Sequence, residues 1–180
     1  IVAWSGNDLY ILNSRGRLIY NNKMSDAIQF ASAGDEYVAV FVGDSDNGVV
    51  SVINSSGQIV DNIPVSNQTL LDIGFFMSTT TSSAQPTELM WMLGLNTTGT
   101  VISTELQTYQ PGKLSTGKSS LGEHIAYSIY DENGNLNIVT TRQILHYSYR
   151  ALEASSPTLI YGYTVEDVKQ NGSVLYQLLV

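Results

Sequence analysis

Short apolar runs separated by polar turns fill the chain, and their pattern predicts strands almost throughout. The clearest stretch holds four such runs, at Ala27–Phe30, Tyr37–Val42, Val49–Ile53 and Gln58–Val60. The runs are rich in β-branched residues and bounded by Gly, Asn, Asp or Ser, so a helix is a poor interpretation. Four short antiparallel strands in about forty residues are typical of one blade of a β-propeller.

Five glycines close short turns between apolar runs at nearly regular intervals. They are Gly16, Gly57, Gly99, Gly134 and Gly172, which lie 41, 42, 35 and 38 residues apart. A period near forty with one hairpin per unit predicts an all-β, β-propeller-like repeat of antiparallel four-stranded blades. The chain begins inside a blade, so we expect residues 1–180 to form a single domain, partial or open, from a longer chain. Strand patterns separate propellers from sandwiches poorly, and a β-sandwich is the alternative fold.

Two segments interrupt this regularity. Thr108–Gly122 is polar and rich in glycine, and we expect it to stand in for missing strands. Ser78–Ser83 consists only of Ser and Thr, a composition that suits either an edge strand or a loop.

Composition narrows the class of partner. Eight Lys and Arg against sixteen Asp and Glu give a net charge of −8, which opposes binding to nucleic acid. No apolar run approaches the ~20 residues that span a bilayer, so we expect no direct membrane insertion of this chain. Cysteine is absent, which excludes disulfides and thiolate chemistry. The low charge content and eleven tyrosines fit an extracytoplasmic bacterial protein, secreted or on the cell surface.

Two hairpins carry a resemblance to known repeats. Leu9–Tyr20 has an aliphatic strand that ends at Asn13, turns through Gly16 and resumes toward an aromatic residue; Val50–Val60 repeats this without the aromatic. These hairpins resemble those of quinoprotein-type and YVTN-type β-propeller repeats, and are closest in character to uncharacterised propeller-like ectodomains of Gram-positive bacteria. The resemblance implies tethering by an upstream membrane helix outside this chain. The recurring blade tryptophan of the quinone enzymes is missing, so no quinone cofactor is implied.

Residues 112–119 match the phosphate-loop pattern G-x-x-x-x-G-K-[ST]. A phosphate loop needs a strand before it and a helix after it, because the amides at the helix N-terminus bind the phosphates. Gly122 blocks helix propagation soon after the motif. We therefore interpret the segment as a surface loop, with no bound nucleotide.

Asp44, Asp46 and Gly48 have the spacing with which calcium loops begin. The glutamate expected six residues after the glycine is replaced by Asn54. Asp44 and Asp46 are therefore candidate ligands of a partial Ca²⁺ site, and the alternative is a hairpin turn that uses these residues for their backbone tolerance.

Four tyrosines, Tyr147, Tyr149, Tyr161 and Tyr163, occupy alternate positions of two neighbouring apolar runs. Alternate residues of a strand share one face, so these side chains are candidates for an aromatic platform that binds a sugar or a peptide. Packing within an edge strand is the alternative.

Catalysis has little support in the sequence. The two histidines, His124 and His146, occupy strand positions without a nucleophile elbow or a metal-binding spacing. We therefore expect a non-catalytic binding or scaffolding module that recognises a protein or glycan through blade loops, with open blade edges suited to a homodimer. Two alternatives stay open. One is a carbohydrate-active propeller, hydrolase or lectin-like, which needs paired carboxylates; the candidates are Asp35, Glu36, Glu88, Glu105, Glu123, Asp131 and Glu132. The other is a calcium-stabilised adhesin.

Overall fold

The chain is described by a computed structural model for residues 1–44, 47–78, 87–96, 98, 100–113, 115–122, 126–132, 135–140, 143–148, 153–154, 159–160, 165–171 and 174–179. These residues form antiparallel strands and turns, which confirms the all-β prediction. No helix that could span a membrane is found among them.

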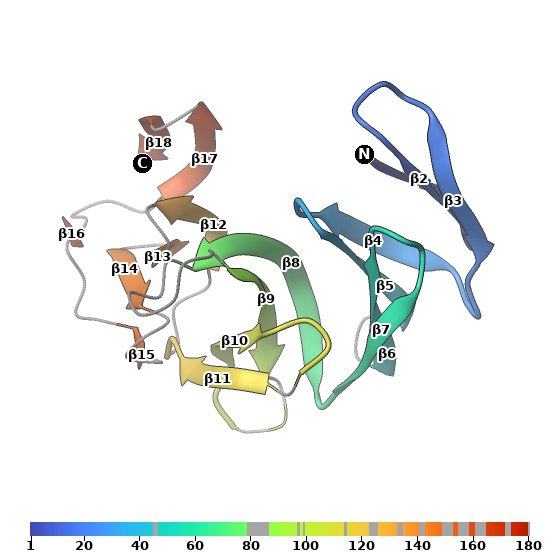
Figure 1. Ribbon diagram of the computed structural model, residues 1–180. Helices are drawn as coiled ribbons and strands as arrows, with labels where there is room; N and C mark the ends of the chain where they lie inside the picture. The colour runs from blue at the N-terminus through green and yellow to red at the C-terminus, as the bar shows by residue number, and fades with distance from the viewer. Residues whose placement is uncertain are drawn as a thin grey trace.

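The strands are β1 (Val2–Ser5), β2 (Asp8–Leu12), β3 (Leu18–Lys23), β4 (Ile28–Ala33), β5 (Tyr37–Asp44), β6 (Asn47–Asn54), β7 (Ile59–Ser66), β8 (Gln68–Ser78), β9 (Thr87–Asn96), β10 (Ser103–Tyr109), β11 (Ser115–Ser120), β12 (Ala126–Glu132), β13 (Asn135–Thr140), β14 (Gln143–Ser148), β15 (Glu153–Ala154), β16 (Leu159–Ile160), β17 (Val165–Asn171) and β18 (Val174–Leu179). They form five sheets in chain order: β1–β3, β4–β7, β8–β11, β12–β16 and β17–β18. The sheets follow one another around an arc that does not close, with the two chain ends on either side of its opening (Figure 1).

The second and third sheets are packed on both faces, which explains why their second strands, β5 and β9, are almost continuously apolar. In β5, Val38, Val40 and Val42 pack toward the preceding sheet, whereas Ala39 and Phe41 pack toward the following one. Alternate residues of a strand point to opposite faces, so each face needs its own apolar set. Each of the three interfaces among the first four sheets thus has a separate hydrophobic core in the described part of the chain.

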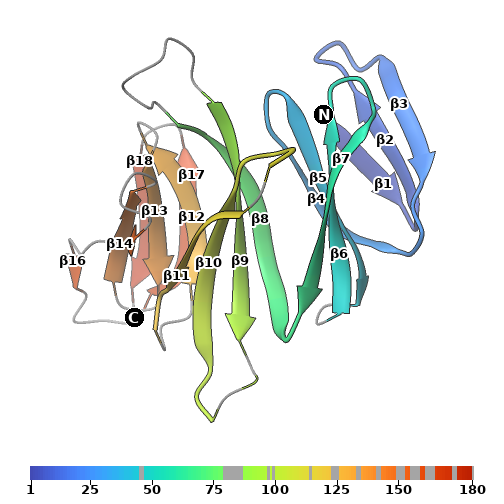
Figure 2. The same ribbon diagram turned by 60° about the horizontal axis from the view of Figure 1, so that its bottom comes forward.

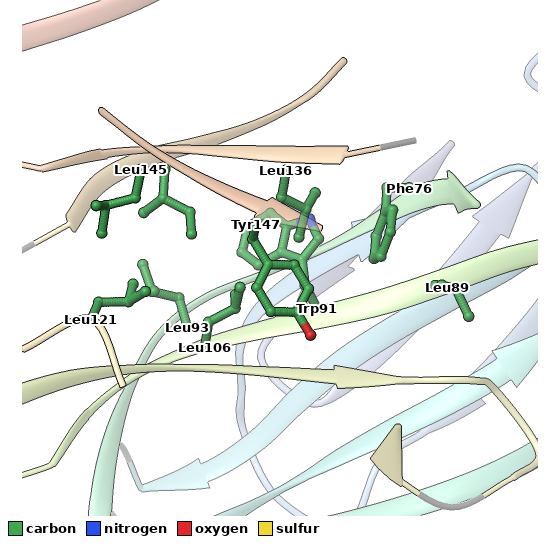
Figure 3. Packing of buried hydrophobic residues seen from close by; sticks show 10 residues of the cluster. Phe76, Leu89, Trp91, Leu93, Leu106, Leu121, Leu136, Leu145 and Tyr147 are labelled. Carbon is green, nitrogen blue, oxygen red and sulfur yellow. The ribbon is translucent and has the colours of Figure 1, made fainter. Parts of the chain in front are cut away.

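One of these cores lies between the β8–β11 and β12–β16 sheets. Leu89, Trp91 and Leu93 project from one face of β9 toward Leu136 and Tyr147 of the next sheet (Figure 3). The intervening residues of β9 belong to the core on its other face.

The turn glycines behave locally as predicted. Gly16 and Gly57 have φ values of 73° and 83°, which favour glycine. In each of these turns the Asn three residues earlier accepts backbone N–H bonds from residues two and four positions after it. Gly99, Gly134 and Gly172 lie outside the described residues.

The near-regular spacing does not mark equivalent hairpins. The turn with Gly57 joins the third and fourth strands of its sheet, but residues 97–102 join the second and third strands of the next sheet. Residues 133 and 134 join the first and second strands of the sheet after that. The glycines are nearly equally spaced along the chain, but their turns join different pairs of strands in successive sheets.

One expectation about strands is wrong. Thr108–Gly122, expected to stand in for missing strands, contains the end of β10 and all of β11. The inward face of β10 is formed by Thr104, Leu106 and Thr108, all buried, so threonines take positions where an apolar residue would have signalled a strand. The following strand is the outer edge of its sheet, and its polar composition fits that position.

Candidate functional site

Two open clefts lie on either side of the β4–β5 turn, at the end of the sheets that also carries the β2–β3 and β6–β7 turns. One cleft, of about 200 Å³, lies between the first two sheets and is lined by Ile1, Asn13, Ile19 and Tyr37, among others. The other, of about 220 Å³, is bordered by Phe76 and Glu88 of the third sheet. Both include residues 33–35, so this turn is the centre of the candidate site.

A buried carboxylate holds the turn in place. Glu88 lies near the start of β9 and is only 5% exposed. Its Oε1 accepts a hydrogen bond from the backbone N–H of Asp35 at 2.6 Å, and its Oε2 accepts those of Glu36 at 2.9 Å and Tyr37 at 3.1 Å. Hydrogen bonds to an ionised group are roughly twice as strong as neutral ones. Glu88 therefore fixes a turn of one sheet to a strand of the next.

The approach of this carboxylate requires a residue without a side chain in the turn. A Cβ atom at Gly34 would collide with the carboxylate of Glu88 and with the ring of Phe75. The backbone N–H of Gly34 donates to the carbonyl of Tyr37 at 2.8 Å, which closes the turn. Gly34 thus allows Glu88 to reach the three amides that follow it.

The site is acidic. Desolvation raises the pKa of the Tyr37 hydroxyl, and the negative charges of Glu36, Glu88 and Asp61 raise it further. Asp61 itself accepts a hydrogen bond from the backbone N–H of Gly112 at 2.6 Å, which links β7 to the β10–β11 turn. Asp35 and Glu36 are exposed, so their side chains extend into solvent from a backbone that Glu88 immobilises.

Two of the candidate catalytic carboxylates, Glu88 and Glu105, have structural partners. Both oxygens of Glu88 are occupied by backbone amides. Glu105, in β10, forms an ion pair with Lys118 at 2.7 Å. Glu88 and Glu105 are thus committed to structural partners, and two of the carboxylates considered for glycoside hydrolysis are accounted for in this way.

The predicted tyrosine platform is only partly within the described chain. Tyr147 is fully buried in the core between the third and fourth sheets, where its hydroxyl lies 3.2 Å from that of Thr108. Tyr147 therefore does not belong to an exposed platform. Alternate residues of a strand share one face, and in β14 the face that carries Tyr147 is buried. Tyr149, Tyr161 and Tyr163 lie outside the described residues, and their ligand-binding role stays a prediction.

Asp44, one of the two predicted calcium ligands, lies at the end of the sheets opposite the candidate site. Asp44 is exposed and ends β5, opposite Asn47 in the tight β5–β6 hairpin. Asp46 lies outside the described residues, so the site stays a prediction. Within the described ranges, no three His, Asp or Glu side chains gather as a metal site would require.

The phosphate-loop motif has a local structure that differs from a nucleotide site. Residues 111–113 form a turn, and the Gly-Lys-Ser part lies in β11, where Lys118 pairs with Glu105. A strand cannot present a helix N-terminus to phosphates. The expectation of a surface loop is wrong for most of the motif, because residues 115–119 lie in β11.

The remaining candidates give no site. His146 lies half-buried in β14, and His124 lies outside the described residues. Sequence reasoning placed Glu88 among several candidate carboxylates and did not predict that it binds the backbone of the β4–β5 turn. Its position directly before the buried run Leu89–Leu93 was the available signal, because a carboxylate there must be solvated by other groups.

A scan against known protein families finds no match for this chain, and a search of curated proteins finds none either. The function is therefore argued from the geometry of the described residues.

Proposed function

We propose that this chain is a non-catalytic binding or scaffolding module of an extracytoplasmic bacterial protein, built as an open β-propeller-like repeat. It recognises a protein partner through the turns at the end of the sheets that carries Gly34. The observation that carries the proposal is the immobilisation of the Asp35–Tyr37 turn by Glu88. These three hydrogen bonds hold the turn in one conformation, from which the side chains of Asp35 and Glu36 extend into solvent.

Rigid presentation favours recognition. A loop already held in one conformation loses little entropy when a partner binds, so more of the contact energy appears as affinity. Binding residues commonly lie on loops positioned by a rigid scaffold. The two clefts, at about 200 and 220 Å³, are smaller than the roughly 300–1,000 Å³ typical of small-molecule sites. A broad partner surface therefore suits this end better than a small ligand.

The acidic side chains of the turn favour a partner that carries positive charge. Asp35 and Glu36 are exposed beside the first cleft, in a chain whose net charge is −8. A partner segment that carries Lys or Arg would be steered toward this end and would find fixed carboxylates there.

The test uses a fluorescent lysine-rich peptide and two double variants with the same loss of charge. We expect D35N/E36Q to weaken peptide binding severalfold at low salt, because it neutralises the fixed turn. D26N/D44N removes two exposed carboxylates at the opposite end and should leave the affinity nearly unchanged. Equal weakening by both variants would reduce the interaction to net charge and contradict the proposal. An oligomer of N-acetylglucosamine that raises the melting temperature would favour the lectin-like alternative.

A further inference from the structure

The acidic β4–β5 turn has a basic neighbour at the same end of the sheets. The β2–β3 turn carries Arg15 and Arg17, and both residues are exposed. The side-chain oxygen of Asn13 accepts hydrogen bonds from the backbone N–H groups of Arg15 at 2.9 Å and Arg17 at 3.0 Å, so this turn is also held in one conformation. Figure 2 shows the two turns at the top of the first two sheets.

Positive charge is concentrated on this hairpin. Arg15, Arg17 and Lys23 are the only Lys or Arg residues before Lys113, and Lys23 lies at the other end of β3. Neither arginine forms an ion pair with any residue in the described ranges. The β2–β3 turn therefore presents a small basic patch whose charges are available to a partner.

A cleft separates this basic patch from the acidic one. The cleft of about 200 Å³ is lined by Asn13 of the β2–β3 turn, by Asp35 and Glu36 of the β4–β5 turn, and by Ile19. The Ile19 side chain is 52% exposed. This end of the molecule thus carries arginines on one side, an exposed aliphatic side chain in the cleft and carboxylates on the other side.

A surface with these features is complementary to its own copy. In a two-fold contact, a residue i of one copy meets a residue j of the other, and j of the first meets i of the second. The arginines of each copy then face the carboxylates of the other, with the two Ile19 side chains near the axis. A partner that carried only positive charge would meet Arg15 and Arg17 beside the acidic turn, and like charges placed together oppose binding.

We propose that the partner of the acidic turn is a second copy of this chain, and that the two copies form a two-fold dimer through this end of their first two sheets. The inference rests on the proposed function, because it names the partner of the same site. Each copy has a net charge of −8, but at physiological salt charges interact over only about 8 Å, so the facing pairs outweigh the distant repulsion. The dimer uses turns, whereas the sequence predicts one through open blade edges.

Two charge reversals and their mixture test the proposal. R15E/R17E and D35K/E36K each place like charges on both pairs of facing patches, so each should weaken dimerisation at least tenfold in analytical ultracentrifugation. Mixed in equal amounts, the two variants should form a heterodimer about as tight as the unmodified dimer. In that heterodimer the introduced glutamates face the introduced lysines, and the native arginines face the native carboxylates.

Matched controls separate this contact from net charge. K23E/K169E has the same change in net charge as R15E/R17E, and it alters exposed lysines at the far end of β3 and in β17. D26K/D44K has the same change as D35K/E36K and alters exposed carboxylates at the opposite end of the sheets. Both controls should dimerise like the unmodified protein, and melting temperatures show that every variant is folded.

The outcomes distinguish this inference from the proposed function. A chain that stays monomeric but binds the lysine-rich peptide through Asp35 and Glu36 would overturn the dimer and leave the proposed function standing. A monomer whose peptide binding does not depend on these carboxylates would overturn both. Failure of the mixed variants to associate, equal weakening by the controls, or loss of the dimer in the full natural chain would also overturn the inference.

Discussion

The hydrogen bonds of Glu88 make a sharp prediction for the substitution E88Q. Glutamine keeps the size of the side chain, but its amide nitrogen is a donor and cannot accept from a backbone N–H. In the least costly orientation the carbonyl oxygen stays on Glu36 and Tyr37, and the 2.6 Å hydrogen bond from Asp35 is lost. The amide nitrogen then faces another donor in a site that is only 5% exposed.

The magnitude follows from the number of bonds affected. Loss of one hydrogen bond to a charged group costs about 1.5–3 kcal/mol, and the other two weaken when the charge is removed. We expect E88Q to lower the free energy of unfolding by about 3 kcal/mol. In a domain of this size, that corresponds to a fall in melting temperature of roughly 6–12 °C.

Urea unfolding at pH 7, followed by tryptophan fluorescence, measures this change. The matched control is E105Q on the neighbouring strand, which breaks an ion pair with a Lys118 side chain that is 57% exposed. The Glu105 side chain is 13% exposed, but solvent screens the charge of Lys118 and glutamine fills the same space, so we expect E105Q to cost about 1 kcal/mol or less. Equal effects of E88Q and E105Q, or a loss below about 1 kcal/mol for E88Q, would refute the structural role assigned to Glu88.

The same site allows a test of coupling. G34A places a methyl group against the carboxylate of Glu88 and should destabilise the fold by about 1–3 kcal/mol. Because G34A and E88Q disturb the same contact, their effects in the double variant should sum to less than the two single losses. Simple additivity would show that the two residues act separately.

Three further changes test the cores and the acidic site. Y147F should cost about 1 kcal/mol in unfolding free energy, because the hydroxyl contact with Thr108 is buried, whereas an unchanged stability would contradict that contact. L106A should cost about 2–5 kcal/mol in the same assay, since Leu106 is fully buried. The folded state raises the pKa of Tyr37 above its ordinary 10.0, so stability should fall as pH rises from 10 through the folded pKa. Y37F should remove that part of the alkaline loss in melting curves, and E36Q should reduce it.

Local patterns in the sequence predicted the first two sheets well. The turns at Gly16 and Gly57 lie where their sequences place them, because Asn and Gly suit these backbone conformations directly. The sequence of a turn did not indicate which two strands of the sheet the turn joins. Any tight turn favours Asn and Gly, so equal spacing could not reveal that later turns join different strands.

The candidate site was beyond sequence reasoning for a physical reason. Glu88 and the amide of Asp35 are 53 residues apart, and no periodic pattern relates a turn to a carboxylate in another sheet. Tyr147 was assigned to a surface because alternation identifies one face of a strand but not which face is buried. Both outcomes depended on the packing of whole sheets.

The separate core at each interface has a consequence for how the molecule gains and loses structure. Among the described residues, each of the first four sheets shares apolar side chains with its immediate neighbours, so the stability of this part is close to a sum of single-sheet and nearest-neighbour contributions. Folding can begin at any of these interfaces and spread outward to the neighbouring sheets. A repeat of this kind can lengthen or shorten by one sheet during evolution while the remaining interfaces stay as they are.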